Sequence, residues 1–337
     1  MLSKSEMEKI SEMLDTQTKN DLFLQICSAY LNECETLVTA DIIRAITAGE
    51  KSGEERAFSS FLAKTFIEDE RLCREMLSEY FLPSVKRLDP EAYKNDPYFK
   101  NIPISQRKIG SWTLSHQSYA PYEGFVRDDY ILDGEREICA LGFFDTEFSF
   151  PTVFENGVEW MAIKPNEIET MKRPIEMASG RVVAFGLGLG YFAYMASIKD
   201  SVSSVTVIEC SEDVISLFKS EILPHFSHPE KIKIIQSDAF EYAKNQMPSE
   251  AYDYAFVDLW RDVSDGVELY SKMKKLESLS KETHFEYWIE KSILLAVRKR
   301  IFNAIIKSIE NGKNTLSYNE ILQRLSFDYL KELVKLF

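Results

Sequence analysis

RVVAFGLGLGYFAYMAS, residues 181–197, joins an apolar run to three glycines at alternate positions and then to a stretch with helical spacing. The run before the glycines is typical of a buried strand, and the residues after them are typical of a helix. Gly186, Gly188 and Gly190 let the backbone take positive φ and approach a ligand closely. The stretch therefore predicts a strand, a ligand-binding turn and a helix. A flexible joint in an ordinary α/β core is the alternative interpretation.

Further strand-like runs follow the glycines, each separated from the next by a helical stretch. They are SVTVIE (204–209), KIKIIQ (231–236), YDYAFVD (252–258) and THFEYWI (283–289). Strands alternating with helices predict a doubly wound, mostly parallel sheet with helices on both faces. Ligands of such sheets bind beyond the carboxyl ends of the strands, near the place where the strand order reverses. No closing hairpin follows residue 289, so the completion of the sheet stays open.

The spacing of the glycines separates two classes of ligand. A dinucleotide-binding turn has the pattern G-x-G-x-x-G, which seats a pyrophosphate on a helix N-terminus. Gly186 and Gly188 fit this pattern, but the third position is Tyr191. The chain offers G-x-G-x-G instead, which disfavours a nicotinamide oxidoreductase.

Four motifs in residues 181–260 resemble, in order, those of the class I S-adenosylmethionine-dependent methyltransferases. They are AFGLGLGY, VTVIECSEDV, IIQSDAF and YDYAFVDLW. The resemblance implies a Rossmann-like, doubly wound fold with S-adenosylmethionine as cofactor. It also implies methyl transfer to an acceptor, which we expect to be a small molecule. A sulfonium is already an activated methyl donor, so positioning of the acceptor supplies much of the rate.

The resemblance also implies roles for individual residues. Glu209 would accept hydrogen bonds from the ribose hydroxyls, as carboxylates do in related folds. Asp238 would bind the adenine amino group, while Asp258 would face the sulfonium and act as the candidate catalytic base. The full set expected at the cofactor is Gly186, Leu187, Gly188, Gly190, Glu209, Cys210, Asp238, Ala239 and Asp258. Trp260, Asp262 and Tyr270 are candidates for the substrate pocket, with helix capping as the alternative for Asp262.

A second resemblance is to the spermidine synthase family. FENGVEWMAIKPNEIETM followed by VVAFGLGLG has that family's order of hairpin, helix and glycine strand. The resemblance implies an aminopropyltransferase that uses decarboxylated S-adenosylmethionine. The family's glycine motif is usually G-G-G-D-G, whereas Leu187 and Leu189 replace its second glycine and its acidic residue here. Because leucine cannot pair with an ammonium, we rank methyl transfer first. A non-catalytic S-adenosylmethionine-binding protein is a further alternative.

The chain as a whole divides into four predicted parts. These are an all-helical N-terminal domain (1–100), a small β-rich connecting segment (101–165), the Rossmann-like domain (166–310) and C-terminal helices (311–337). Asn156-Gly157 predicts a hairpin turn. The segment KPNEIETMKRPIEMASG predicts a helix with Asn166 as N-cap and Gly180 as its stop. Ser317 and Glu320 predict a capping box.

Composition disfavours several classes of function. The 337 residues carry a formal net charge of -14, so a nucleic-acid-binding surface is not favoured. Five scattered cysteines without a CxxC pair predict free thiols, and no metal site is expected. The chain shows neither a signal peptide nor a membrane-spanning run, which favours a cytoplasmic protein without a membrane partner. The helical N-terminal segment is compatible with a homodimer. The identity of the acceptor stays open.

Overall fold

The computed structural model describes residues 2–49 and 53–336, and the chain divides into two units. The first unit contains Asn95–His116 and Pro151–Phe337. The second contains Leu2–Lys94 and Gln117–Phe150. The segment predicted as one β-rich connection, 101–165, therefore contributes to both units. Among the described residues, no helix has the length and apolarity needed to cross a membrane.

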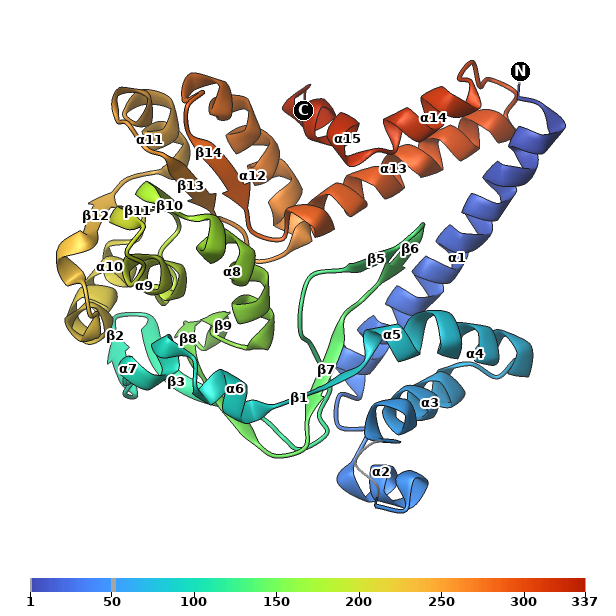
Figure 1. Cartoon of the computed structure of the whole chain (residues 1–337), viewed down its shortest axis with the longest axis horizontal. Coiled ribbons are helices and arrows are strands. Elements are labelled where there is room, and N and C mark those ends of the chain that lie inside the picture. The colour runs from blue at the N-terminus through green and yellow to red at the C-terminus, as the bar shows by residue number, and fades with distance from the viewer. Residues whose placement is uncertain (1, 50–52, 337) are drawn as a thin grey trace. The chain divides into compact units, whose positions relative to one another are not determined.

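A five-stranded parallel sheet forms the core of the first unit (Figure 1). Its strands are β10 (Gly180–Phe185), β11 (Val202–Glu209), β12 (Ile232–Gln236), β13 (Tyr254–Val257) and β14 (His284–Tyr287). Their order is β12-β11-β10-β13-β14, and all four pairings are parallel. Each strand-like run predicted from the sequence forms one of these strands, THFEYWI included. In the part of the chain that the structure describes, β14 is an edge of this sheet and no hairpin extends it.

The central strands are apolar because both of their faces are covered. Val182, Val183, Ala184 and Phe185 of β10 are at most 2% exposed. Such continuous apolar runs are typical of parallel strands with helices on both sides. The connecting helices are α9 (Tyr191–Ser197), α10 (Glu212–Leu217), α11 (Ala239–Asn245) and α12 (Val263–Leu276). The order reverses at β10, so its carboxyl end lies beside that of β13.

Helix α8 (Pro165–Met177) precedes the sheet and corrects the predicted helix boundaries. The N-cap is Lys164 rather than Asn166, and Pro165 takes the first helical position. Proline lacks a backbone N–H, and it suits that position because an N–H there would have no intrahelical acceptor. The helix ends before Gly180, which begins β10 with a φ of +66°.

A lysine closes the C-terminus of α8. The ammonium of Lys199 donates to the carbonyl oxygens of Ile175, Glu176 (2.7 Å) and Ala178 (2.8 Å). These are among the last carbonyls of the helix, which have no intrahelical partners. A cation at this end also interacts favourably with the helix dipole.

Replacing Lys199 with methionine is expected to lower the free energy of unfolding by about 1–2 kcal/mol, since hydrogen bonds to a charged group are lost. Urea denaturation followed by circular dichroism measures the loss. Lys172→Met is the matched control, because Lys172 is exposed and pairs with Glu169 of the same helix. Equal effects of the two substitutions would contradict the capping role.

A second, four-stranded sheet has the order β2-β3-β8-β9. Its strands are β2 (Arg107–Ile109), β3 (Trp112–Tyr119), β8 (Phe148–Glu155) and β9 (Val158–Ala162). The predicted Asn156-Gly157 hairpin is confirmed, because β8 and β9 pair antiparallel around it. Both turn residues have positive φ, at +51° and +83°.

The C-terminal helices belong to the first unit. They are α13 (Glu290–Glu310), α14 (Tyr318–Arg324) and α15 (Phe327–Leu333). Helix α15 packs against α13, as Figure 1 shows, and the hydroxyl of Ser271 in α12 donates to the carbonyl of Val334 at 2.6 Å. The predicted capping box of Ser317 and Glu320 is confirmed at the start of α14.

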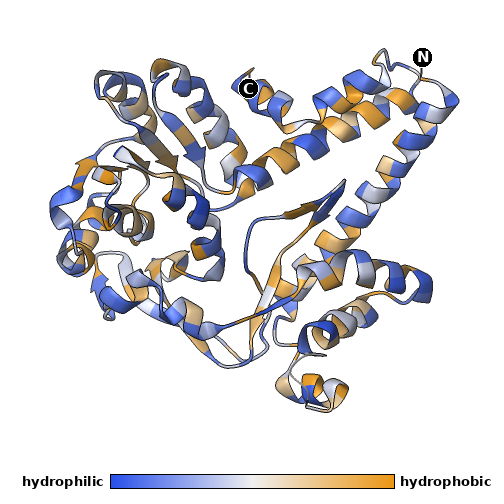
Figure 2. Cartoon of the chain, in the orientation of Figure 1, coloured by the Kyte–Doolittle hydropathy of each residue, from blue (hydrophilic) through white to orange (hydrophobic). Residues whose placement is uncertain are grey.

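The second unit has an aromatic core under helix α1 (Lys4–Glu33). The hydrophobic positions of α1 gather in its C-terminal half, as the colouring of Figure 2 shows. Phe23 of this half lies edge-on to Phe81, with ring centroids 5.0 Å apart, and Phe58 stacks on Phe143 at 4.7 Å. The other helices are α2 (Ala40–Thr47), α3 (Glu54–Phe66), α4 (Glu70–Met76), α5 (Leu82–Ser84) and α6 (Pro90–Lys94).

The prediction that residues 1–100 are all helical is wrong at one place. Strand β1 (Lys86–Leu88) pairs in parallel with β7 (Leu141–Phe144), which also pairs with β4 (Phe125–Val126). A three-residue strand held by a partner more than 50 residues away leaves no local periodicity to recognise. The unit also contains the hairpin of β5 (Ile131–Asp133) and β6 (Arg136–Ile138).

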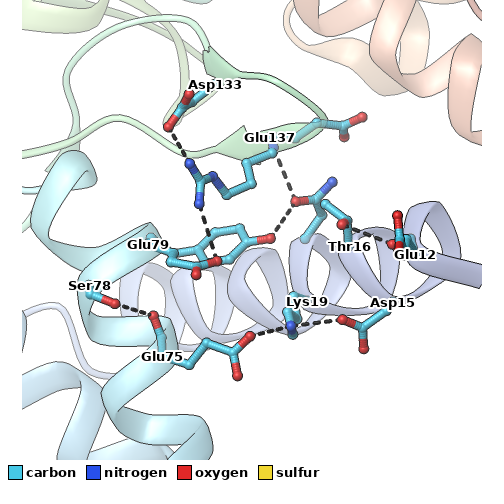
Figure 3. Close-up of polar contacts among 12 residues, drawn as sticks. Glu12, Asp15, Thr16, Lys19, Glu75, Ser78, Glu79, Asp133 and Glu137 are labelled. Atoms are coloured by element: carbon cyan, nitrogen blue, oxygen red, sulfur yellow. Dashed lines mark hydrogen bonds and ion pairs between the residues drawn. The ribbon is translucent and has the colours of Figure 1, made fainter. Parts of the chain in front are cut away.

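Polar contacts join α1 to the hairpin of β5 and β6 and to helix α4, which contains Glu75 (Figure 3). Lys19 pairs with Asp15 at 2.8 Å and with Glu75. The side chain of Asn20, 1% exposed, accepts from the hydroxyl of Tyr80 (2.9 Å) and from the backbone N–H of Glu137 (3.1 Å). Because a buried amide must be satisfied, this network fixes the rotation of α1.

Candidate ligand site at the glycine turn

The glycine turn lies at the carboxyl end of β10 and requires its glycines for steric reasons. The φ of Gly186 is +99°, and a Cβ there would lie 2.1 Å from the backbone oxygen of Asp258. At Gly190, with φ +74°, a Cβ would lie 2.3 Å from the ring of Phe218. Any side chain at these positions would collide with its neighbour, so close approach, rather than flexibility, accounts for both glycines.

Glu209, the last residue of β11, is held beside this turn. One carboxylate oxygen accepts from the backbone N–H of Leu187 at 3.2 Å, and the other accepts from the N–H of Ser211 at 2.8 Å. The thiol of Cys210 lies 3.5 Å from the second oxygen. A carboxylate has about four acceptor positions, so capacity remains for ligand hydroxyls. The structure thus brings Leu187, Glu209 and Cys210 together.

Asp238 and Ala239 follow the next strand, β12. Asp238 is the N-cap of α11, and one of its oxygens accepts from the backbone N–H groups of Phe240 and Glu241, both at 2.9 Å. Ala239 is the buried first residue of that helix. Capping accounts for the position of Asp238, and its predicted contact with adenine stays a prediction.

Asp258, directly after β13, shares this end of the sheet with Glu167 from the first turn of α8. The backbone N–H of Asp258 donates to the carbonyl of Phe185 at 2.9 Å, which joins the two strand ends. Burial raises the pKa of the Asp258 carboxyl to about 7. Burial and the charge of Asp258 together raise the pKa of Glu167 to about 8. Two neighbouring carboxyls resist simultaneous ionisation, so the pair retains a proton near neutral pH.

Sequence reasoning missed Glu167 as a site residue. The sequence predicts it only as an acidic residue in the first turn of a helix, where it complements the helix dipole. Glu167 is 8% exposed and lies on the buried side of α8 with Ile168 and Met171. Its i, i+4 spacing from Met171 was the one signal available, since residues four apart share a helix face.

Two of the predicted substrate-pocket residues are buried, and their place in a substrate pocket stays a prediction. Trp260 is 5% and Tyr270 0% exposed, with rings 6.3 Å apart, and the hydroxyl of Tyr270 donates to Glu290 at 2.7 Å. Both are core residues of this structure. Asp262 is the N-cap of α12 and forms a capping box with Asp265, so the capping alternative accounts for it.

Leu189 and Tyr191 are explained by helix α7 (Pro97–Asn101), which packs against α9. Leu189 is fully buried, and its carbonyl accepts from the hydroxyl of Tyr98 at 2.6 Å. The hydroxyl of Tyr191 donates to Asp96 at 2.9 Å. Because the side chain of Leu189 is fully buried, its lack of charge does not decide whether the site accepts an ammonium.

Met161 of β9 lies against the turn. Its sulfur accepts from the backbone N–H of Leu189 at 3.3 Å, and a Cβ on Gly188 would lie 2.1 Å from that sulfur. A thioether is a weak acceptor on a flexible side chain. A ligand with stronger hydrogen-bonding groups could therefore displace the side chain of Met161 from the turn.

No protein-family model matches this chain, and no curated protein matches it. Among solved structures, it is similar to a spermidine synthase from Thermotoga maritima, with a TM-score of 0.31 and 15% identity over 44% of this chain and 55% of that one. A spermidine synthase in complex with the transition-state analogue AdoDATO gives a TM-score of 0.27 and 16% identity, over 36% and 43% of the two chains. The chain thus spans about half the length of these proteins. Similarity at this level establishes no shared family or activity.

Proposed function

We propose that this protein is a transferase with a Rossmann-like domain of the class I methyltransferase type, which binds an S-adenosylmethionine-type sulfonium at the glycine turn. The observation that carries the proposal is the gathering of Glu209, Asp258 and Glu167 around that turn. The ligand is a cation with two ribose hydroxyls, and such a donor set fits it. The carboxyls of Asp258 and Glu167 favour a positively charged ligand, while the carboxylate of Glu209 can accept hydrogen bonds from the ribose hydroxyls.

Each residue has a distinct part in the proposed reaction. Glu209 would hold the ribose, and the N–H of Leu189 would exchange the sulfur of Met161 for a ligand oxygen. A bound sulfonium supplies an activated alkyl group, so the protein has mainly to orient the acceptor. Asp258, with a pKa of about 7, would take a proton from an amine or hydroxyl acceptor near neutral pH.

Methyl transfer is the first candidate reaction. Near neutral pH, the Asp258–Glu167 pair retains a proton and offers roughly one negative charge, which suits the single sulfonium of S-adenosylmethionine. We propose a small-molecule acceptor because the chain carries a net charge of -14. Aminopropyl transfer is the second candidate, and Glu167 is the observation that favours it. Decarboxylated S-adenosylmethionine adds an unneutralised ammonium, and a second ionised carboxyl would pair with it.

Calorimetric titration with S-adenosylmethionine, S-adenosylhomocysteine and decarboxylated S-adenosylmethionine tests the proposal. We expect all three to bind, with the tighter of the two sulfonium ligands identifying the donor. Glu209→Gln should lower the affinity for S-adenosylmethionine by about tenfold or more, or about 1.4 kcal/mol, because one charged acceptor is lost. Glu212→Gln, an exposed glutamate in α10, is the control and should leave affinity unchanged. If none of the three ligands binds, the proposed function fails.

A further inference from the structure

A pocket opens beside the edge strand β14, at the opposite end of the parallel strands from the glycine turn. Its volume is about 630 Å³, which lies within the usual range for small-molecule sites. The walls come from the end of α12, the turn after it, the first residues of β14 and the C-terminal Lys335. Because β14 starts at His284 and runs parallel to β10, this pocket lies at the amino ends of the strands. The glycine turn lies at their carboxyl ends.

The lining of this pocket is cationic, although the chain is strongly acidic. The basic residues in the lining are Lys274, Lys275, Lys281, Lys335 and His284. Glu277 supplies the one carboxylate among the lining residues, and its oxygen already accepts from Lys274 at 2.6 Å and from the hydroxyl of Tyr287 at 2.8 Å.

Two lysines remain available to a ligand. Lys335 is engaged by Glu332 at 2.8 Å. In the described chain, 2–49 and 53–336, no carboxylate lies within ion-pair distance of Lys275 or Lys281, both of which are exposed. Glu282 follows Lys281 in the chain but is not part of the lining. A concave surface with unpaired cations concentrates anions.

A buried hydroxyl adds a second, independent sign of a ligand. Ser280 is one of the lining residues, and its hydroxyl oxygen is shielded from solvent and has no hydrogen-bond partner among the residues that the structure describes. Buried polar groups are normally satisfied, so an unpartnered hydroxyl beside cations indicates a missing acceptor. Phe285 contributes an apolar wall to the same pocket.

We propose that this pocket binds a small molecule with two or more phosphate groups, held by Lys275, Lys281 and the hydroxyl of Ser280. Several phosphate oxygens can accept from two ammonium groups and a hydroxyl, whereas a single carboxylate offers only two oxygens. The site is separate from the proposed sulfonium site, because the two lie at opposite ends of the strands. The proposal does not depend on the proposed function.

Calorimetric titration of the full chain with ATP and with inorganic pyrophosphate tests this site. Both probes should bind saturably at low salt, and the affinity should fall by about tenfold between roughly 50 mM and 300 mM salt because exposed charges are screened. Lys275→Glu combined with Lys281→Glu should weaken both probes by more than about tenfold. The charge-matched control is Lys233→Glu combined with Lys244→Glu, two exposed lysines on β12 and α11, which should change affinity less than about twofold.

Two further measurements keep the outcome clear. Ser280→Ala, which changes no charge, should weaken pyrophosphate severalfold, while circular dichroism shows that each variant is folded. Saturating S-adenosylhomocysteine should leave pyrophosphate binding unchanged. The proposal is overturned if neither probe binds, if both double variants weaken binding equally, or if S-adenosylhomocysteine competes. Failure of S-adenosylmethionine to bind would leave this result untouched.

Discussion

Gly186→Ala is expected to lower the free energy of unfolding by about 3 kcal/mol or more and to abolish ligand binding at the glycine turn. The φ of +99° costs an L-residue about 1–2 kcal/mol, and overpacking adds about 1–3 kcal/mol. The atom that a Cβ would meet, 2.1 Å away, is the backbone oxygen of Asp258, which no change of rotamer can move aside. Urea denaturation measures the stability, and titration with S-adenosylhomocysteine measures binding.

Gly312→Ala is the matched control for this substitution. Gly312 has a φ of +66°, and a Cβ there would meet no atom of the described residues within 4 Å, so only the backbone cost remains. We expect a loss of about 1 kcal/mol there, with ligand binding intact. Similar losses for the two variants would show that β10 and β13 can separate at their carboxyl ends, against the close contact seen here.

The sheet could be predicted from sequence because its determinants are local. The central strands of the parallel sheet are apolar runs between helical stretches, and both of their faces are covered, so the pattern needs no distant partner. The hairpin at Asn156-Gly157 and the capping box at Ser317 also follow from neighbouring residues alone. The same holds for Glu209 and Asp258, which end apolar strands.

The parts that escaped prediction depend on partners far along the chain. Tyr191 donates a hydrogen bond to Asp96, and Asp258 interacts electrostatically with Glu167, each across about 90 residues or more. Tyr270 is a polar aromatic residue near the site in sequence, but its ring turns into the core toward Glu290. Local patterns report which face of an element is buried, and they do not report what covers it.

These distant contacts alter the chemical argument. Sequence alone places a neutral leucine where the spermidine synthase motif has an acid, and on that ground it disfavours an ammonium ligand. In the folded chain Leu189 is buried, while Glu167 of α8 lies close enough to Asp258, at the end of β13, for the charge of Asp258 to raise its pKa. Under the proposed function, the choice between methyl and aminopropyl transfer would depend on the charge state of this pair.

Glu167→Gln is expected to stabilise the protein at alkaline pH. Both folded pKa values, about 7 and about 8, lie above the ordinary values of 3.8 and 4.5. Between about pH 4 and pH 8 the folded state thus binds more protons than the unfolded state, and stability falls as the pH rises. Removing one carboxyl relieves this cost by at least about 1.4 kcal/mol near pH 8.5, the equivalent of one pKa unit, and by almost nothing near pH 4.5.

Urea denaturation of the two proteins across this pH range measures the difference, with Glu169→Gln on the same helix as control. Glu169 pairs with Lys172 at the surface, so its substitution should leave the pH dependence of the parent intact. A parallel pH dependence for Glu167→Gln and the parent would show that Glu167 ionises normally.

The Asp258–Glu167 pair should also determine how strongly the site prefers a positively charged ligand. As the pH rises from about 6 to about 8.5 the pair gains negative charge, so the affinity for cationic S-adenosylmethionine should rise about tenfold relative to neutral-sulfur S-adenosylhomocysteine. Asp258→Asn should flatten this ratio, because one of the two titrating groups is gone. A ratio that stays constant with pH in the parent would place the sulfonium away from Asp258 and Glu167. A rise for decarboxylated S-adenosylmethionine that exceeds the rise for S-adenosylmethionine would favour aminopropyl transfer.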